Sequence, residues 1–331
     1  MTEHVPKYKI ARTMEQFCAL LQISIKDVLA KVDLPSDYLE SEGRGVSARQ
    51  YFEGWSAAVE LADRSDLPLF LGQAYARGPF NPAFFAFTCS PTVLVGLERM
   101  SVLKPLVGPL LLNIIPDGDE LRLVKSSSVL GLELPHKFAA TEMVFFVEAM
   151  RICTGHAVRP SRVVMSDKLE CDPDLEAYFG TKITYGSTPE ISILKDDANR
   201  PLLSRNATQW ASMEPEFRRQ LDALSAGETI TARVRKTLSE MLPSGLSNIT
   251  ETASRMHLST RSLQRKLSSE GQSYQLVLDD TRRALSMHYL RYTELNSEEI
   301  SYLLAYRDPN SFYRAFHGWT GMTPKAARVS S

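Results

Sequence analysis

Two segments near the C-terminal end of the sequence carry the same spacing of apolar residues. The first covers residues 252–267 and the second residues 300–316, with one extra residue in the turn of the second. The apolar positions then coincide in four pairs: Met256 with Leu304, Leu258 with Tyr306, Leu263 with Phe312, and Leu267 with Phe316. The pattern indicates an internal repeat of one helical unit, with the same face buried in each copy.

Each copy predicts a short helix, a turn of about three or four residues and a second helix. Ser259 is a natural N-cap for a helix over residues 260–267, and Pro309 fits an early position of the matching helix in the second copy. This is the helix-turn-helix arrangement, in which the second helix enters the major groove of DNA. Two such helices on one chain predict contact with two successive groove faces.

The second helix of each copy has a polar face opposite its buried pair of residues. We expect the base-reading residues to be Arg261, Gln264 and Arg265 in the first copy and Asn310, Tyr313 and Arg314 in the second. Arginine can donate two hydrogen bonds to guanine, and asparagine and glutamine can pair with adenine. Tyrosine suits a phosphate or a thymine methyl group.

Two other interpretations of these side chains stay open. Such a face can simply be solvated, as on any surface helix. Arg265 and Arg314 occupy equivalent positions, and one of them can instead brace its domain by pairing with a carboxylate. The charge distribution favours nucleic acid weakly. From Thr229 onward the chain has 14 basic and 9 acidic residues, a net charge of about +5, whereas the remainder carries about −6.

The sequence before the repeats indicates an α+β domain. Helices are expected over residues 90–103 and 137–153, and strands over residues 110–115, 120–124, 162–165, 182–185 and 190–194. Turn residues from Pro116 to Asp119 join the first two strands into a hairpin. Ala226-Gly227-Glu228 is the best linker candidate, so we predict domains of residues 1–225 and 226–331. Within the second, a long helix over about residues 274–291 is expected to join the two copies.

Motifs for catalysis or metal binding are missing from the 331 residues. The four cysteines are dispersed without a CxxC pair, and the six histidines form no HExxH. Walker, GxGxxG and GxSxG sequences are absent, so we expect no catalytic residue, metal or cofactor. The apolar region 102–115 is too short and broken to span a bilayer, and no secretory signal is evident. A cytoplasmic location follows as the expectation.

The segment from about Thr229 to Arg328 resembles the DNA-binding domain of the AraC/XylS family of bacterial transcription regulators. The sequence ISYLLAYRDPNSFYRAFHGWTGMTP, residues 300–324, carries most of the resemblance. It implies an all-α domain with two helix-turn-helix units joined by a long helix, and it implies base reading by the six residues named above. Ser301 and Ala305 depart from the family pattern, which usually has alanine and glycine there. Alanine at 305 costs about 1 kcal/mol if the left-handed backbone conformation is kept.

The N-terminal region is similar to the arabinose-binding-type sensor domain of an AraC subgroup that includes ornithine- and virulence-associated regulators. The segments that carry this looser resemblance begin at Tyr51, Cys89 and Ala177. It implies an effector-binding and oligomerisation domain, but it names no ligand and assigns no effector-binding residue. The expected partners are double-stranded promoter DNA, a small-molecule effector, a second copy of the chain and, for an activator, RNA polymerase. Two alternatives stay open: a ligand-independent DNA binder whose N-terminal domain only oligomerises, and an enzyme domain fused to a DNA-binding tail.

Overall fold

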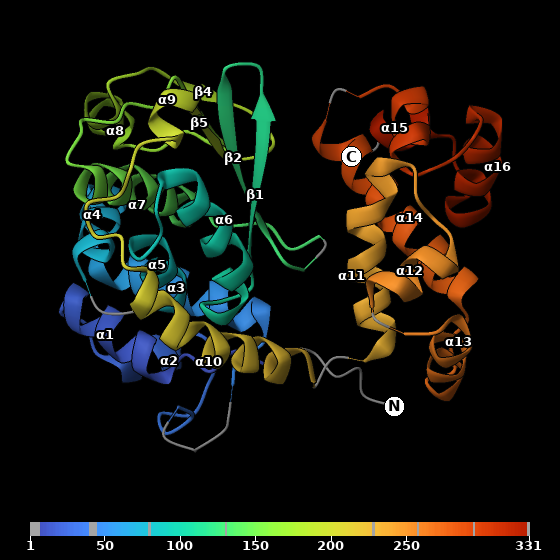
Figure 1. Cartoon of the computed structure of the whole chain (residues 1–331), viewed down its shortest axis with the longest axis horizontal. Helices are drawn as coiled ribbons and strands as arrows, with labels where there is room; N and C mark the ends of the chain where they lie inside the picture. Colours follow the sequence, from blue (N-terminus) through green and yellow to red (C-terminus); the bar gives the residue numbers. More distant parts are fainter. Residues whose placement is uncertain are drawn as a thin grey trace. The chain divides into compact units, whose positions relative to one another are not determined.

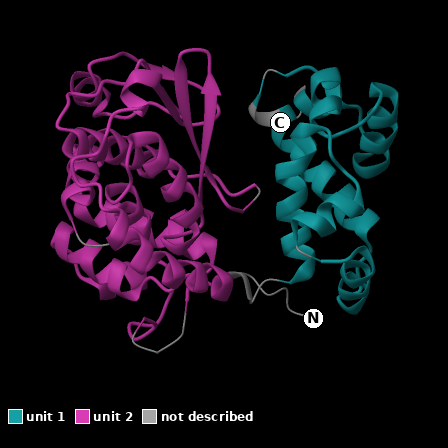
Figure 2. Cartoon of the chain, viewed as in Figure 1, with its two compact units in different colours: residues 1–5, 225–331 teal, residues 6–224 magenta. Residues whose placement is uncertain are grey.

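A computed structural model describes residues 7–39, 45–78, 81–129, 131–226, 229–256, 258–293 and 295–329. The described residues up to Leu224 form one compact unit, and those from residue 225 onward form a second (Figure 2). Two of the three predicted linker residues, Gly227 and Glu228, lie outside the described residues.

The N-terminal unit begins with helices and continues as a mixture of strands and helices (Figure 1). Its first elements are α1 (Ala11–Leu21), α2 (Ile25–Lys31), α3 (Ala48–Ala62), α4 (Leu67–Arg77), α5 (Pro82–Thr88), α6 (Val93–Leu103) and the 3-10 helix η1 (Lys104–Leu106). The later elements are β1 (Leu110–Asp117), β2 (Glu120–Ser127), α7 (His136–Thr154), β3 (Arg162–Met165), α8 (Asp172–Phe179), β4 (Ile183–Tyr185), β5 (Glu190–Leu194), α9 (Lys195–Ala198) and α10 (Ala207–Ala226). The α+β prediction for this region is confirmed.

The five strands form one sheet in the order β1-β2-β5-β3-β4. Strands β1 and β2 form the predicted hairpin, with Leu112 opposite Lys125 and Asp117 opposite Glu120. Gly118 in its turn has φ 55°, in the left-handed region that suits glycine. The β3–β4 pair is parallel, and the β2–β5 and β3–β5 pairs are antiparallel.

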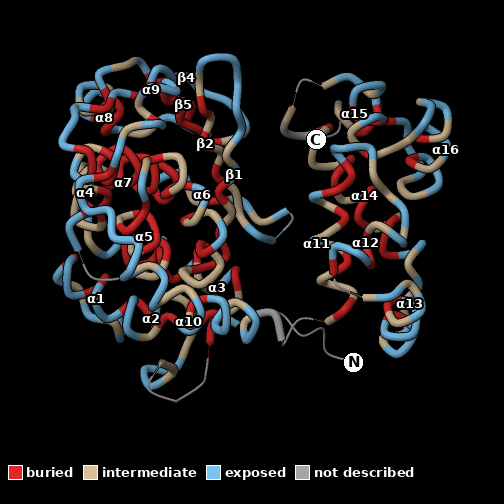
Figure 3. The backbone as a smooth tube through the Cα atoms, viewed as in Figure 1, coloured by how far each residue is buried: buried red, intermediate tan, exposed pale blue. Residues whose placement is uncertain are grey.

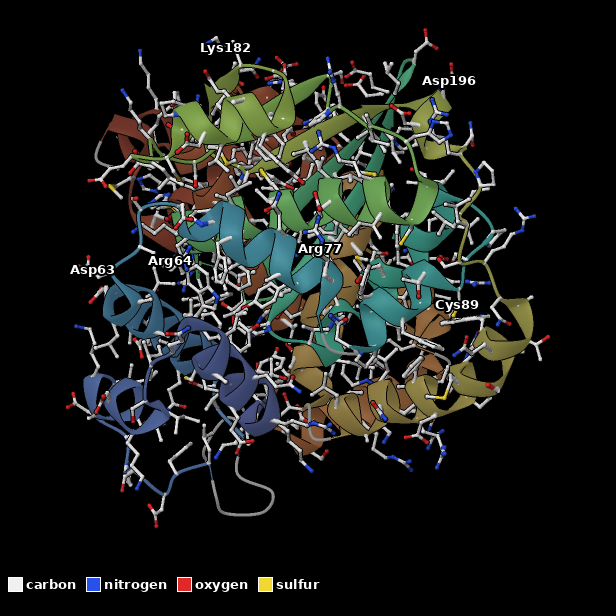
Figure 4. All side chains as sticks on the ribbon, turned by 90° about the vertical axis from the view of Figure 1, so that its left-hand side faces the viewer. Asp63, Arg64, Arg77, Cys89, Lys182 and Asp196 are labelled. Atoms are coloured by element: carbon white, nitrogen blue, oxygen red, sulfur yellow. The ribbon has the colours of Figure 1, made fainter. Side chains whose placement is uncertain are left out.

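Helix α7 lies at the centre of the N-terminal unit and is buried along most of its length (Figure 3). A Cβ atom at Gly72 of α4 would lie 2.5 Å from Val144 of α7, so only glycine permits this close helix contact. Arg77, labelled in Figure 4, lies at the end of α4. It forms an ion pair with buried Glu148 of α7. Tyr178 of α8 donates a hydrogen bond to the same carboxylate at 2.6 Å. These contacts tie α4 and α8 to the central helix.

Every element that the structure describes in the C-terminal unit is helical. The elements are α11 (Ile230–Met241), the 3-10 helix η2 (Leu242–Ser244), α12 (Ile249–Arg255), α13 (Thr260–Ser269), α14 (Tyr274–Tyr292), α15 (Ser297–Leu303), α16 (Pro309–Thr320) and α17 (Pro324–Val329). Helix α14 contacts α11, α15, α16 and α17, and its bounds agree with the predicted long helix. Val234, Leu238 and Val277 are fully buried in the core of this unit. No helix in the described part of the chain is both long enough and apolar enough to cross a membrane.

Candidate DNA-binding interface

Helix α13 presents the first predicted reading face. Its N-cap is Ser259, whose Oγ accepts a hydrogen bond from the Ser262 amide at 3.2 Å, as predicted. Leu263 and Leu267 are fully buried against the C-terminal core. The side chains expected to read bases, Arg261, Gln264 and Arg265, are all exposed on the opposite side of the helix.

Helix α16 presents the second predicted reading face. Asp308 is the N-cap and accepts a hydrogen bond from the Ser311 amide at 2.9 Å, and Pro309 occupies the first turn. Phe312 and Phe316 are fully buried, with ring centroids 5.7 Å apart. The predicted reading residues Asn310, Tyr313 and Arg314 are exposed.

The arginines on these two faces bear on the alternative that one of them is structural. Across the described ranges, neither Arg261 nor Arg265 has an ion-pair or hydrogen-bond partner. Arg314 donates a hydrogen bond to Ser311 Oγ at 3.3 Å and forms no ion pair with a described carboxylate. Within the described residues, the two α13 guanidinium groups are therefore unpartnered, and the Arg314 guanidinium makes only this one side-chain hydrogen bond. Their contact with bases stays a prediction.

The turn between α15 and α16 keeps the left-handed conformation at the unusual alanine. Ala305 has φ 57°, so the strain expected from the sequence is present. Buried Arg282, from the middle of α14, donates hydrogen bonds to the carbonyl oxygens of Leu304 at 2.9 Å and Ala305 at 3.1 Å. The same guanidinium lies 4.2 Å from the centre of the Tyr306 ring. Arg282 therefore holds the turn that leads into α16.

A carboxylate at the end of α13 holds the start of the C-terminal unit. Glu270, the C-cap of α13, accepts hydrogen bonds from the amides of Ile230 at 2.6 Å and Thr231 at 2.9 Å, and from Thr231 Oγ1 at 2.7 Å. Burial alone would raise the pKa of Glu270. The bonds from Thr231 and Ile230, together with the charge of Lys266, hold that pKa below its ordinary value. The first turn of α11 is thus fixed to the end of α13.

Sequence reasoning missed both Arg282 and Glu270. Each acts through a contact with residues more than 20 positions away along the chain. Arg282 lies on a helix that the sequence does predict, and Glu270 lies just after another, but no local spacing indicates which carbonyl or amide groups they bind.

The N-terminal unit has a groove of about 530 Å³ between α2, α3 and the segment before α7. Lys31, Arg49, Glu53 and Glu60 line it together with Phe52 and Pro135. Lys31 pairs with Glu60 at 3.0 Å, which leaves charges of both signs on the groove walls. Among the described residues, no group of three His, Cys, Asp or Glu side chains is placed to hold a metal ion; His4 and His257 lie outside these residues.

A helical unit with two exposed arginine-bearing helix faces, in one chain with an α+β unit, is the construction expected of a DNA-binding transcription regulator. The chain belongs to the AraC family of transcription regulators. Residues 23–202 match the family profile for the arabinose-binding domain of the AraC transcription regulator, and residues 252–329 match a helix-turn-helix domain. The protein is thus a DNA-binding transcription regulator with an arabinose-binding-type N-terminal domain, and it is not an enzyme.

Relatives of this chain carry the same description. The HTH-type transcriptional regulator VirS of Mycobacterium tuberculosis is 30% identical over 91% of this chain and 89% of that protein. The ornithine utilization regulator of Pseudomonas aeruginosa is 36% identical over 42% of this chain, and the match spans 40% of that regulator. The solved structure of the transcriptional regulator CdpR from Pseudomonas aeruginosa aligns over 96% of this chain and 97% of that one, with a TM-score of 0.41 and 20% identity. The predicted resemblance to the AraC family, including its ornithine-associated regulators, is confirmed.

Proposed function

We propose that this protein reads a specific promoter sequence through two helix-turn-helix units, α12–α13 and α15–α16, joined by α14. Helices α13 and α16 are the recognition helices in this proposal. The observation that carries it is the matched construction of these helices. Each has a serine or aspartate cap, a fully buried pair four residues apart, and an exposed face with an arginine that forms no ion pair with a described carboxylate.

The two faces differ in chemistry, so each subunit should read an asymmetric site. Arg261, Gln264 and Arg265 favour guanine and adenine edges along α13. Asn310 and Arg314 favour an adenine and a guanine along α16, and Tyr313 suits a phosphate or a thymine methyl group. Unequal faces predict that the two halves of the site do not repeat one sequence.

The N-terminal domain, residues 1–225, is proposed to bind a small-molecule effector and a second copy of the chain, and residues 226–331 to bind DNA. The family profile over residues 23–202 supports a binding domain. RNA polymerase is the further partner if the protein activates its promoter, and the cytoplasm is the compartment in which these partners meet.

Selection of bound duplexes from a random pool by the full-length protein tests this proposal. Arg265→Ala and Arg314→Ala should each relax the preference at one base position by about 1–3 kcal/mol without unfolding the protein. Lys168→Ala, an exposed residue of the N-terminal unit, is the matched control and should leave the selected sequence unchanged. Specific binding should also weaken steeply with salt, because phosphate neutralisation releases counterions.

Two results count against the proposal. A protein that selects no sequence above the random pool at any moderate salt concentration does not read a specific promoter. An arginine variant that is less stable but keeps the wild-type base preference at every position shows that the arginine is structural.

A further inference from the structure

Three charged side chains from different elements meet in the core of the N-terminal unit. Lys104 of η1 donates to Glu142 Oε2 of α7 at 2.5 Å, and Lys125 Nζ of β2 lies 2.8 Å from the same oxygen. Only 3% of Lys104, 1% of Lys125 and 8% of Glu142 is exposed. Ionised groups this deeply buried are rare unless their charges are matched.

The charges in this cluster do not balance. Two ammonium groups face one carboxylate, and within the described residues neither lysine forms an ion pair with a second acid. The hydrogen-bond groups do not balance either, because two ammonium groups carry six N–H donors and converge on one oxygen. Lys125 Nζ is buried without a hydrogen bond of acceptable geometry to the described chain. With both lysines protonated, the cluster therefore has a surplus of one positive charge and several N–H donors.

Burial of the second lysine costs stability. Burial, together with the charge of Lys104, lowers the pKa of Lys125 to about 7, against the opposing effect of Glu142. A single Lys–Glu pair would satisfy the buried carboxylate, and an apolar side chain at position 125 would avoid the penalty of burying a second ammonium group. Structure alone gives no reason for the second lysine.

Aromatic rings enclose the lysines. The Phe146 ring centre lies 5.1 Å from Lys104 Nζ and 5.6 Å from Lys125 Nζ, and the Phe145 ring centre lies 5.3 Å from Lys104 Nζ. The surroundings of the surplus charge are thus apolar on the side of these rings. A ligand that completes the site needs an anionic group with several hydrogen-bond acceptors. It also needs a hydrocarbon part that can lie against these rings.

Two aromatic residues relate this cluster to the groove beside α3. Phe52, which lines the groove, stacks edge to face on Phe138 of α7 with ring centroids 5.6 Å apart. Phe138 lies one helical turn before Glu142 on α7, so the two side chains share a face of that helix.

We propose that Lys104 and Lys125 bind the carboxylate of a small organic monocarboxylate, with its hydrocarbon against Phe145 and Phe146. With both lysines protonated, the one surplus positive charge matches a monoanion, whereas a phosphate dianion would leave the core negative. The assignment rests on the proposed effector-binding role of the N-terminal domain and gives that effector a chemical class. It requires no covalent step.

Butyrate is a suitable probe, because it joins a carboxylate to a short hydrocarbon chain. Thermal unfolding of the full-length protein is measured with increasing sodium butyrate, sodium chloride or sodium phosphate at matched ionic strength. A ligand that binds only the folded state raises the unfolding temperature in a saturable way. We expect this for butyrate with the wild type and with Lys168→Met, an exposed control.

Lys125→Met and Lys104→Met should each weaken butyrate binding at least tenfold and raise the unfolding temperature without ligand. Each variant leaves one balanced lysine–glutamate pair, so at least one of the two should fold. Three results overturn the proposal: no saturable butyrate effect on the folded wild type, equal butyrate binding by a lysine variant, or tighter binding of phosphate than of butyrate.

The same variants on a selected promoter duplex separate this site from the regulatory role. Butyrate binding that depends on Lys125, in a protein that selects no DNA sequence, would leave the carboxylate site standing and remove the proposed function. Sequence-specific DNA binding without a butyrate effect on protein stability would support the proposed function and remove the carboxylate site.

Discussion

Replacement of Arg282 by methionine should loosen the second reading helix selectively. The guanidinium of Arg282 donates to the carbonyl oxygens of Leu304 and Ala305, and it lies over the Tyr306 ring. Methionine keeps much of the apolar stem of arginine and its packing in the core, but it removes both donors and the charge. Ala305, in the turn before α16, would then keep its left-handed conformation without hydrogen bonds from α14.

The magnitude follows from the contacts that are lost. A hydrogen bond from a charged donor contributes about 1.5–3 kcal/mol, and the ring contact adds about 0.5–2 kcal/mol. Relaxation of the freed carbonyl groups toward water returns part of this sum, so we expect a loss of about 3 kcal/mol. Since 1.4 kcal/mol is a tenfold change, amide hydrogen exchange in α15 and α16 should accelerate about a hundredfold where it reports local opening.

Hydrogen exchange followed by mass spectrometry on the full-length protein resolves this effect by segment. Arg283→Met is the matched control, because Arg283 is the next residue on α14 and its side chain is exposed. Exchange in α15 and α16 should be unchanged in that control, and exchange in α7 should be unchanged in both variants. Less than a threefold acceleration for Arg282→Met, or an equal effect from Arg283→Met, would refute the view that this arginine holds the turn.

Two smaller effects follow from the same unit. Ala305→Gly should stabilise the protein by about 0.5–1 kcal/mol in urea unfolding, because glycine relieves the left-handed strain at φ 57°. The control Ala284→Gly, within α14, should destabilise the protein by about 1 kcal/mol. A change of the same sign in both variants would contradict this reasoning. Glu270→Gln should cost about 1–2 kcal/mol at neutral pH, since one charged acceptor for three donors is lost. The pKa of Glu270 is lowered by folding, so its stabilisation is full above the ordinary pKa of glutamate and is lost as pH falls through the lowered value. The difference between wild type and Glu270→Gln should therefore shrink in acid, and a constant difference from pH 7 to pH 3 would show that the charge is irrelevant.

The sequence predicted best those features that depend on residues close together in the chain. Leu263 and Leu267 lie four residues apart behind a serine cap, and Phe312 and Phe316 repeat this spacing behind Asp308. Such spacing fixes which side of a helix is buried, whatever the rest of the chain does. The hairpin of β1 and β2 was predictable for the same reason, because its turn residues stand between two apolar runs.

Contacts between distant segments were not predictable. The sheet order places β5 between β2 and β3, and nothing in the individual strands specifies that neighbour. The meeting of Lys104 and Lys125 at Glu142 depends on how η1, β2 and α7 pack. In the sequence each residue is one ordinary charge among many, and only the fold reveals that all three are buried together.

The bonds at Glu270 give the C-terminal unit a mechanical property. Ile230 and Thr231 are among the first residues of that unit after the predicted linker, and their amides are held by the residue that ends α13. A pull along the backbone from residues before Thr229 would therefore load these hydrogen bonds before it strained the apolar core. The end of α13 would bear such a force directly, whereas α16 would bear it only through the helices between them, α14 and α15.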